Sequence, residues 1–526
     1  MTGRLGHPGS ALGSGWRARL GTLAPVPVHP RPSRPAPRRL AEVAATLGVP
    51  SPPEAERSVL TGVTLDSRAV LAGDLYAALP GSLTHGGKFA GHAVRAGAVA
   101  VLTDPAGAQL AAGCGVPLLV VDDPRARLGE VSRLIYGGAA PPLLAITGTN
   151  GKTTVSYLVE AGLRAAGLVT GLVGTVETRI AGLTLPSVRT TPEAPELHAL
   201  LAAMVEGGVQ SVAMEVSSHA LALHRVDGLR FAVGAFTNLS QDHLDFHGSL
   251  EAYFTAKARL FDGRSEHEVV NVDDEHGRRL VGPRTIMVSA AGVPAAHWRA
   301  ADVRPVPGGG SEFTALGPDG LSLPAATRLA GGFNVANALL ALAVLAVGGV
   351  DPKVAADGMA ATTVPGRLEP VDAGQPFAAL VDYAHTPEAV HTLLAALRPV
   401  TDGRLIVVLG CGGDRDPSKR APMGGAAAEG ADLFVLTDDN PRSEDPAAIR
   451  AQMLAGVTRL PGGARAEVAV VPGRRAAIAA AVGAAGPGDT VVVAGKGHEQ
   501  GQDVGGVVSP FDDRLVLREL MGALVR

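Results

Sequence analysis

The sequence has little cysteine, little net charge and no long apolar run. Its two cysteines, Cys114 and Cys411, form neither a disulfide framework nor a metal-binding pattern, which favours a reducing compartment. A net charge of −4 gives no overall attraction to nucleic acid or to anionic membranes. The most apolar helix-like run, residues 337–349, is too short and too interrupted by glycine to span a bilayer. We therefore expect a cytoplasmic monomer that binds small molecules, with no nucleic-acid partner and no stable membrane association.

The first forty residues lack acidic side chains altogether, since the first acid is Glu42. The stretch HPRPSRPAPRRL (29–40) is rich in proline and arginine and cannot bury enough apolar surface to fold. We expect residues 1–40 to form a disordered tail.

The rest of the chain alternates short apolar runs with Ala-rich helical stretches. This alternation predicts an α/β protein with mostly parallel sheets covered by helices. Each run ends in Gly, Ser, Asp or Asn, and ligands of open α/β sheets bind at such carboxyl ends. The clearest runs are 98–104, 116–123, 142–148, 210–217, 231–240, 404–413, 431–439 and 489–497.

A length of 526 residues favours about three domains of roughly 150 residues each. The Gly-Pro stretch at 136–142 marks one boundary, and the stretch TTVPGRLEPV (362–371) marks the other. The expected divisions are a tail at 1–40 and domains at 41–140, 141–366 and 367–526.

The strongest motif is AITGTNGKTTVSYLVEAGL (145–163), an apolar strand that runs through a Gly-rich turn into an amphipathic helix. Backbone N–H groups in such a turn close around phosphates, and the helix N-terminus favours anions. Lys152 is expected to reach the β- and γ-phosphates and Thr153 to hold Mg²⁺. The general phosphate-loop pattern places Gly five positions before Gly151, where this chain has Ile146, so we expect a tighter loop.

Two further segments carry candidate metal ligands. Glu215 follows an apolar run in MEVSSHAL (214–221), where a carboxylate can approach a Mg²⁺–nucleotide complex. The loop TNLSQDHLDFHG (237–248) brings together two acids and two histidines, and the helix after it carries Lys257. Taken alone, the loop is equally compatible with a solvated turn, and Lys257 with a surface lysine.

Several weaker motifs follow. Asn334 and Asn337 lie one helical turn apart and either pair with an adenine edge or cap the helix. Arg367, Asp382 and His385 flank the second boundary. Three more strand ends carry polar turns, namely LGCGGDRDPSKR (409–420), TDDNPRSEDP (437–446) and AGKGHEQ (494–500).

The order of these motifs resembles the Mur ligases over about residues 60–515. The resemblance rests on GTNGKTT, EVSSHAL, TNLSQDHLDFHG, YFTAKARLF, GGFNVANAL, VPGR, VDYAHTPEAV, GCGGDRDPSKR, DNPR and GKGHE. It implies a first domain that binds the UDP part of a precursor, a central P-loop ATPase domain, and a Rossmann-like third domain that brings an amino acid.

Within that family, the resemblance is to the branch that adds diaminopimelate to UDP-MurNAc-L-Ala-D-Glu in peptidoglycan precursor synthesis. The implied reaction uses ATP and Mg²⁺. The γ-phosphate passes to the D-glutamate side chain, an amino group of diaminopimelate attacks the acyl phosphate, and phosphate leaves.

The resemblance also implies roles for individual residues. The implied catalytic residues are Lys152, Glu215, His243 and Lys257. The implied ATP-binding residues are Gly148, Thr149, Asn150, Gly151, Lys152, Thr153, Thr154, Asn334, Asn337, Arg367 and Asp382. Those for the UDP-MurNAc-dipeptide are Leu65, Ser67, Thr190, Thr191, Ser217 and Arg225. Those for diaminopimelate are Arg415, Asp439, Asn440, Pro441, Arg442, Gly495 and Glu499. The implied metal ligands are Thr153, Glu215, His243 and a carbamate on Lys257.

Three of these assignments have a chemical rationale. A carbamate turns Lys257 (N6-carboxylysine when modified) into an anionic oxygen ligand suited to Mg²⁺, and it requires a neutral amine, so we expect a lowered pKa. Arg442 is expected to bind the distal carboxylate of diaminopimelate through two hydrogen bonds. Asn440 and Glu499 would then hold the distal amino group, with Arg415 on the other carboxylate. Leu223 departs from relatives that have Gln there, so one polar substrate contact is absent.

Alternatives remain open. A folate-polyglutamating ligase shares the GTNGKTT loop but should lack this form of the DHLDFH loop and the DNPR stretch. The L-lysine-adding relative shares almost everything except the amino-acid pocket, where the Arg after Asn-Pro is usually missing. A non-catalytic nucleotide-binding relative would keep the fold without ligase activity, and the presence of all four implied catalytic residues argues against it.

Overall fold

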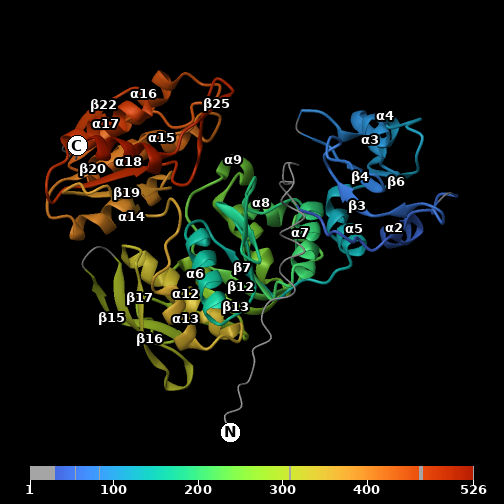
Figure 1. Cartoon of the computed structure of the whole chain (residues 1–526), viewed down its shortest axis with the longest axis horizontal. Helices are drawn as coiled ribbons and strands as arrows, with labels where there is room; N and C mark the ends of the chain where they lie inside the picture. Colours follow the sequence, from blue (N-terminus) through green and yellow to red (C-terminus); the bar gives the residue numbers. More distant parts are fainter. Residues whose placement is uncertain (1–29, 54, 82, 307–309, 461–465, 525–526) are drawn as a thin grey trace, which may run out of the picture.

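The computed structural model describes residues 30–53, 55–81, 83–306, 310–460 and 466–524. Three α/β units follow one another along the chain, as predicted (Figure 1). Figure 1 draws the first unit in blue, the central unit in green and yellow, and the third in orange and red. Their sheets fall inside the three expected segments, although the domain boundaries themselves stay predictions.

The first unit is a four-stranded parallel sheet in the order β3-β4-β5-β6. Its core includes apolar side chains of α2 and α5 and continues onto α7 of the central unit. The elements are β1 (Arg38–Arg39), α2 (Leu40–Leu47), β2 (Val59–Leu60), β3 (Gly62–Thr64), β4 (Asp74–Ala78), η1 (Gly86–Phe89), α3 (Ala90–Ala96), β5 (Ala100–Thr103), α4 (Pro105–Leu110), β6 (Leu118–Val120) and α5 (Pro124–Tyr136).

Part of the expected tail is folded. Residues 1–29 lie outside the described residues, but Arg31 forms an ion pair with Asp74 at 2.6 Å. Ser33 donates from its backbone N and its hydroxyl to the Glu206 carboxylate at 2.7 and 2.6 Å. Residues 30–39, which we assigned to the tail, therefore contact both the first and the central unit. Polar contacts to acidic partners replace the apolar burial that the segment lacks.

The central unit contains an eleven-stranded sheet in the order β10-β9-β8-β11-β7-β12-β13-β14-β15-β16-β17, parallel from β8 to β15. Helices α6, α12 and α13 cover one face, and α7 and α8 cover the other. The strands are β7 (Leu143–Thr147), β8 (Thr170–Val173), β9 (Glu177–Ile180), β10 (Leu183–Pro186), β11 (Ser211–Glu215), β12 (Phe231–Phe236), β13 (Ser265–Asn271), β14 (Thr285–Ser289), β15 (Trp298–Pro305), β16 (Ser311–Leu316) and β17 (Ser322–Thr327). The helices are α6 (Lys152–Ala165), α7 (Ala194–Glu206), α8 (Ser218–Ala222), α9 (Leu244–His247), α10 (Leu250–Ala258), η2 (Arg259–Phe261), α11 (Glu275–Arg278), η3 (Pro318–Gly320), α12 (Gly332–Val347) and α13 (Pro352–Met359).

The third unit is a six-stranded sheet in the order β18-β19-β23-β20-β21-β22, parallel except for β18. Helices α14, α15 and α16 pack on one face, and α17 and α18 pack on the other. The elements are β18 (Glu369–Pro370), β19 (Ala378–Asp382), α14 (Pro387–Leu397), η4 (Arg398–Val400), β20 (Leu405–Leu409), η5 (Pro417–Lys419), α15 (Arg420–Gly430), β21 (Leu433–Leu436), α16 (Pro446–Thr458), β22 (Glu467–Val470), α17 (Arg474–Ala484), β23 (Thr490–Ala494), β24 (Gly501–Val504), β25 (Val507–Pro510) and α18 (Asp513–Leu524).

The carboxyl ends of the parallel strands position the predicted site residues. In the central unit, β7 leads into the GTNGKTT loop and β11 ends at Glu215. In the third unit, β21 precedes DNPR and β23 precedes GKGHE. Within the described part of the chain, no helix has the length and apolarity needed to cross a membrane.

Candidate functional site

The GTNGKTT loop has the backbone conformation expected of a tight phosphate loop. Gly148 and Gly151 adopt φ angles of 144° and 85°. A Cβ atom on Gly148 would lie 1.8 Å from the Thr237 hydroxyl oxygen, and one on Gly151 would lie 2.5 Å from Asn337 Oδ1. Only glycine fits both positions, and α6 begins directly afterwards at Lys152. The loop therefore presents a helix N-terminus to a cavity that residues of the central and third units line.

Two lysines converge on this loop. Lys152 Nζ donates to the carbonyl oxygens of Gly148 and Thr149 at 2.9 and 2.8 Å. Lys257 Nζ donates to the same Gly148 oxygen at 2.6 Å and lies 4.5 Å from the centroid of the Tyr253 ring. Lys257 is only 1% exposed. Burial, reinforced by the charge of Lys152, holds the pKa of Lys257 well below its ordinary value. The lowered pKa that we expected for Lys257 is thus found, and burial also lowers the pKa of Lys152.

Glu215 is the buried acid of the site, with no exposed surface. Its carboxylate accepts hydrogen bonds from the Thr153 hydroxyl at 3.1 Å and from the backbone N and hydroxyl of Thr175 at 2.8 and 2.9 Å. Arg367 Nη2 donates to the Thr153 hydroxyl at 3.3 Å. Thr153 is therefore held between an acid of the central unit and a guanidinium from the start of the third expected segment.

His243 lines the same cavity and has a left-handed backbone conformation, with φ of 53°. Its Nε2 lies 3.4 Å from Asp242 Oδ2, and its ring packs edge-on against His219 with centroids 4.8 Å apart. Partial burial, together with the charges of Lys152 and Lys257, lowers the pKa of His243 to about 4. Its imidazole is therefore neutral at neutral pH, which is the form that binds metals.

Of the four predicted metal ligands, only Glu215 and His243 are of the His, Cys, Asp or Glu types. Within the described ranges, no group of three or more His, Cys, Asp or Glu side chains has the arrangement to hold a metal ion. A metal at this place would therefore need oxygen atoms from Thr153, from the nucleotide or from a modified Lys257.

The central and third units together enclose a cavity of about 450 Å³ around these groups. Asn337 Nδ2 donates to Asn334 Oδ1 at 3.0 Å. Arg367 stacks on the Tyr383 ring at 4.3 Å. Asp382 accepts from the backbone N of Leu368 and Ala384 at 2.8 Å each, and burial raises its pKa. The predicted residues that line the cavity are Thr149, Asn150, Gly151, Lys152, Thr153, Thr154, Thr190, Glu215, Ser217, His243, Lys257, Asn334, Asn337, Arg367, Asp382 and His385.

The predicted UDP-MurNAc-dipeptide residues form two groups. The Thr191 hydroxyl donates to the Glu215 carbonyl oxygen at 2.9 Å and accepts from Ser217 N at 3.1 Å. Arg225 donates to the Thr191 carbonyl oxygen at 3.3 Å, and the Thr190 and Thr175 hydroxyls lie 3.0 Å apart. Leu65 and Ser67 instead follow β3 in the first unit, and Leu223 is the C-cap residue directly after α8.

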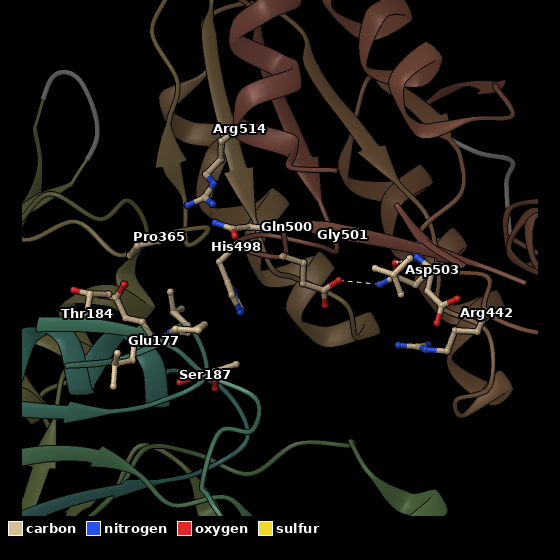
Figure 2. A pocket seen from close by; sticks show the side chains of 17 residues that line it. Glu177, Thr184, Ser187, Pro365, Arg442, His498, Gln500, Gly501, Asp503 and Arg514 are labelled. Atoms are coloured by element: carbon tan, nitrogen blue, oxygen red, sulfur yellow. Dashed lines mark hydrogen bonds between the residues drawn. The ribbon is translucent and has the colours of Figure 1, made fainter. Parts of the chain in front are cut away.

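A second cavity, of about 680 Å³, lies between β9–β10 of the central unit and the GKGHE segment of the third (Figure 2). Figure 2 shows Glu177, Thr184 and Ser187 on one side and His498 and Arg442 on the other. Of the seven predicted diaminopimelate residues, Asn440, Arg442 and Glu499 line it. Asp439 and Pro441 flank these in the chain, and a Cβ atom on Gly495 would come within 2.8 Å of Asp439 Oδ2. Arg415 is exposed and does not line this cavity.

The β24–β25 hairpin holds Arg442 in place. Arg442 has a left-handed φ of 53°, its backbone N donates to Asp503 O at 3.0 Å, and its own carbonyl oxygen accepts from Gly505 N at 2.6 Å. Its Nη1 donates to the Gly413 carbonyl oxygen at 2.5 Å. The turn predicted at DNPR thus exists, and it directs the guanidinium to the cavity.

Some residues that the structure places at these cavities have no assigned role in the sequence analysis. Thr175 lines both of them and binds Glu215, yet no motif marks it. The Tyr253 ring contacts Lys257 Nζ, although no role was predicted for this tyrosine. Lys496 lies inside GKGHE, but a lysine in a polar turn carries no signal of its own burial.

Three family models match the chain. The Mur ligase middle domain covers residues 146–345. The glutamate ligase domain of the Mur ligases covers residues 366–497. A domain described as the Mur ligase family catalytic domain covers residues 59–136. These matches cover most of the residues of the first, central and third units.

Similar proteins agree with these models over nearly the whole chain. The chain is 59% identical to a UDP-N-acetylmuramoyl-L-alanyl-D-glutamate–2,6-diaminopimelate ligase of Streptomyces coelicolor, over 94% of this chain and 98% of that protein. It is 58% identical to the ligase of the same name from Streptomyces avermitilis, again over 94% and 98%. A solved structure with this name aligns with a TM-score of 0.65 and 32% identity, over 93% of this chain and all of the other. The chain therefore belongs to the Mur ligase family.

Proposed function

We propose that this protein is an ATP-dependent ligase that forms an amide bond between UDP-N-acetylmuramoyl-L-alanyl-D-glutamate and 2,6-diaminopimelate. The observation that carries the proposal is that two cavities adjoin at Thr175. One holds a phosphate loop and two lysines, and the other holds a guanidinium and a carboxylate. Relatives at 58–59% identity that bear this ligase's name support the same conclusion.

The ATP side binds and positions the nucleotide. In the proposal, the backbone N–H groups of residues 148–154 surround the phosphates, and Lys152 leaves the loop carbonyls to contact them. Asn334 and Asn337 face the base, and Asp382 accepts from the ribose. Arg367 lies near Thr153 and is suited to neutralise charge on the transferred phosphoryl group.

The residues around Glu215 fit a magnesium ion. Thr153 and Glu215 offer hard oxygen donors, and His243 offers a neutral imidazole. When bound, Mg²⁺ neutralises charge on the phosphate oxygens. Lys257 fits the fourth place as a carbamate, because its lowered pKa leaves a neutral amine able to add carbon dioxide. As a free ammonium, Lys257 would repel the ion.

The acceptor dipeptide is proposed to enter beside Thr175. Thr190, Thr191, Ser217 and Arg225 cluster at the end of β11, within reach of the D-glutamate arm. Leu65 and Ser67 in the first unit would contact the UDP end of the substrate.

The reaction follows from this arrangement. The γ-phosphoryl group of ATP passes to the side-chain carboxylate of D-glutamate, which gives ADP and an acyl phosphate. The neutral amine of diaminopimelate then attacks the acyl carbon, phosphate leaves, and the new amide nitrogen loses a proton. Arg442 and Glu499 orient the amino acid from the distal end, and positioning of this kind supplies much of the rate. The product would be a peptidoglycan precursor, and the use of ATP and a UDP-linked substrate favours the cytoplasm as the place of the reaction.

Phosphate release tests the proposal. The purified protein should release phosphate from ATP only when both the UDP-linked dipeptide and diaminopimelate are present. Parallel assays with meso-diaminopimelate, LL-diaminopimelate and L-lysine define the amino acid. ATP turnover that ignores both substrates would refute the ligase, and equal kcat/KM for L-lysine would favour the lysine-adding alternative.

A further inference from the structure

Lys496 is a buried cation beside the amino-acid cavity. It follows β23, and its side chain has no exposed surface. Its Nζ lies 2.9 Å from Glu499 Oε2 and 3.0 Å from Asn440 Oδ1, so it joins two residues that line the cavity without lining it itself. A buried charge is expensive unless it is paired, and these two oxygens supply the pairing.

Lys496 also settles the orientation of the Asn440 amide. A lysine ammonium and a backbone N–H only donate hydrogen bonds. Both Lys496 Nζ and Asp503 N contact the same atom of Asn440, at 3.0 Å each, so that atom is the oxygen. The amide nitrogen then donates to Glu499 Oε2 at 2.8 Å. The carbonyl oxygen of Asn440 is therefore already used twice.

What remains for a ligand is a matched set of donors and acceptors. Asn440 retains one amide N–H, and Arg442 retains guanidinium N–H groups beyond the one bound to Gly413. Glu499 Oε2 is shared by Lys496 and Asn440, and within the described ranges Oε1 has no hydrogen-bond partner. Two donors beside one carboxylate oxygen suit a carbon atom that bears both a carboxylate and an ammonium group.

We propose that Lys496 is a positioning residue that keeps the Asn440 N–H, not its carbonyl oxygen, toward the amino-acid cavity. Asn440 and Arg442 then bind the distal carboxylate of the incoming amino acid, and Glu499 binds the distal ammonium. This assignment rests on the proposed function, and it moves Asn440 from the amino group, where the sequence led us to expect it, to the carboxylate. L-Lysine has the ammonium without the carboxylate, so Lys496 contributes to discrimination against it.

Replacing Lys496 by methionine tests the proposal, because methionine keeps the length of the side chain and removes its donors. The Asn440 oxygen would then keep only the Asp503 N–H as a donor, so the amide is held less firmly and presents its N–H to the substrate carboxylate for less of the time. We expect the KM for diaminopimelate to rise about 10- to 50-fold, the effect of losing a hydrogen bond to a charged group. The kcat, the KM for ATP and the KM for the UDP-linked dipeptide should stay near the values of the unmodified protein. The kcat/KM ratio of diaminopimelate to L-lysine should fall.

Two further variants complete the test. Lys353→Met removes an exposed lysine on α13 that pairs with Asp357, and it should change none of these constants. Asn440→Asp keeps an oxygen for Lys496 and for Asp503 N but replaces the N–H with a second oxygen. It should reproduce the KM effect of Lys496→Met, and the double variant should add little, because Lys496 acts through Asn440.

The outcomes separate this proposal from the proposed function. Inactivity of the unmodified protein with diaminopimelate would overturn both. An active protein in which Lys496→Met raises every KM alike and lowers kcat would overturn only the positioning role. If Lys496→Met does not fold, Asn440→Asp decides alone, and unchanged discrimination against L-lysine would overturn the proposal.

Discussion

An almost completely buried lysine lies at or beside each of the two cavities. The two lysines differ in whether an acidic side chain contacts them. In the ATP-side cavity, Lys257 contacts a backbone carbonyl oxygen and an aromatic ring, with the cationic Lys152 nearby. Beside the amino-acid cavity, Lys496 contacts the carboxylate of Glu499 and the amide oxygen of Asn440. Their side chains are equally buried, so burial does not separate them.

The difference lies in the available counter-charge. Lys257 has no acid within hydrogen-bond distance among the described residues, and its pKa falls accordingly, which makes the amine available for chemistry. Lys496 has a carboxylate at 2.9 Å, and its ammonium serves as a fixed donor. A buried lysine is therefore reactive or structural according to whether its neighbours supply an anion.

Substitution of Lys257 should reduce activity more than any other change considered for the two cavities. Lys257→Arg keeps the positive charge but cannot form a carbamate, so the proposed metal site would meet a cation where it needs an anionic oxygen. We expect kcat to fall about 100- to 1,000-fold, comparable to losing one preorganised electrostatic contact. Phosphate release with all substrates measures the loss of kcat. Intact-mass analysis of the protein that retains Lys257 should show the mass of one added carbon dioxide. If Lys257→Arg were about as active as the protein with the original sequence, Lys257 would not be a reactive lysine, and it would not differ from Lys496 in this respect.

Arg442→Ala separates the two cavities. Arg442 lines only the amino-acid cavity, so the KM for diaminopimelate should rise roughly 30- to 100-fold from the lost guanidinium–carboxylate contact. The KM for ATP should hardly change. Steady-state kinetics with each substrate varied in turn measure both constants, with Arg442→Lys as the intermediate case. Equal rises in the KM for ATP and the KM for diaminopimelate would mean that Arg442 stabilises the fold and does not bind the amino acid.

The fold and the ATP side follow largely from local sequence. The Gly-rich loop, the strand ends and the helix starts lie within a few residues of one another, so their geometry follows from short-range backbone rules. The turn at DNPR also follows from local sequence, although the contacts that hold Arg442 come from Asp503, Gly505 and Gly413. The buried α12 was likewise predictable, since the run at 337–349 is apolar on all sides.

Long-range contacts were not predictable from the sequence. The orientation of Asn440 depends on Lys496 and on Asp503, which come from segments more than fifty residues away in the chain. Thr175 joins the two cavities only because β8 lies beside β11. Arg415 carried a predicted role, yet its loop leaves it exposed and away from the cavity. In each case, the missing information is the relative position of segments that the sequence alone does not bring together.

The pKa of Lys257 also predicts how the stability of the protein depends on pH. The pKa of Lys257 in the folded protein is lower than the ordinary 10.5 of an unfolded chain. Between these two values the unfolded chain binds the additional proton, so stability rises with pH through that window. Below the folded pKa, the full cost of the buried charge is present. In buffer free of carbon dioxide, Lys257→Met should therefore stabilise the protein by about 1–4 kcal/mol at low pH, and the gain should fade as the pH approaches 10.5.

The corresponding substitution beside the amino-acid cavity, Lys496→Met, should change the stability in the opposite direction. Lys496→Met removes one of two hydrogen-bond donors from Glu499 Oε2 and one of two from Asn440 Oδ1, so it should lower the free energy of unfolding by about 1–3 kcal/mol at neutral pH. Calorimetric Tm values of both variants and of Lys353→Met across a pH series measure the contrast. Shifts of the same sign at neutral pH would show that the two lysines do not differ in the way their partners suggest.

The smallest expected effect is at Thr175, which belongs to both cavities. Its hydroxyl donates to Glu215 Oε2 at 2.9 Å and lies 3.0 Å from the Thr190 hydroxyl. Thr175→Val keeps the shape and the backbone contact to Glu215 but removes the hydroxyl, so the buried carboxylate loses one hydrogen bond. We expect the KM values for ATP and for diaminopimelate to rise together, by about 2- to 10-fold, with Thr175→Ser close to the unmodified protein. A rise confined to one substrate would assign Thr175 to a single cavity, and the two sites would then have to be treated as separate.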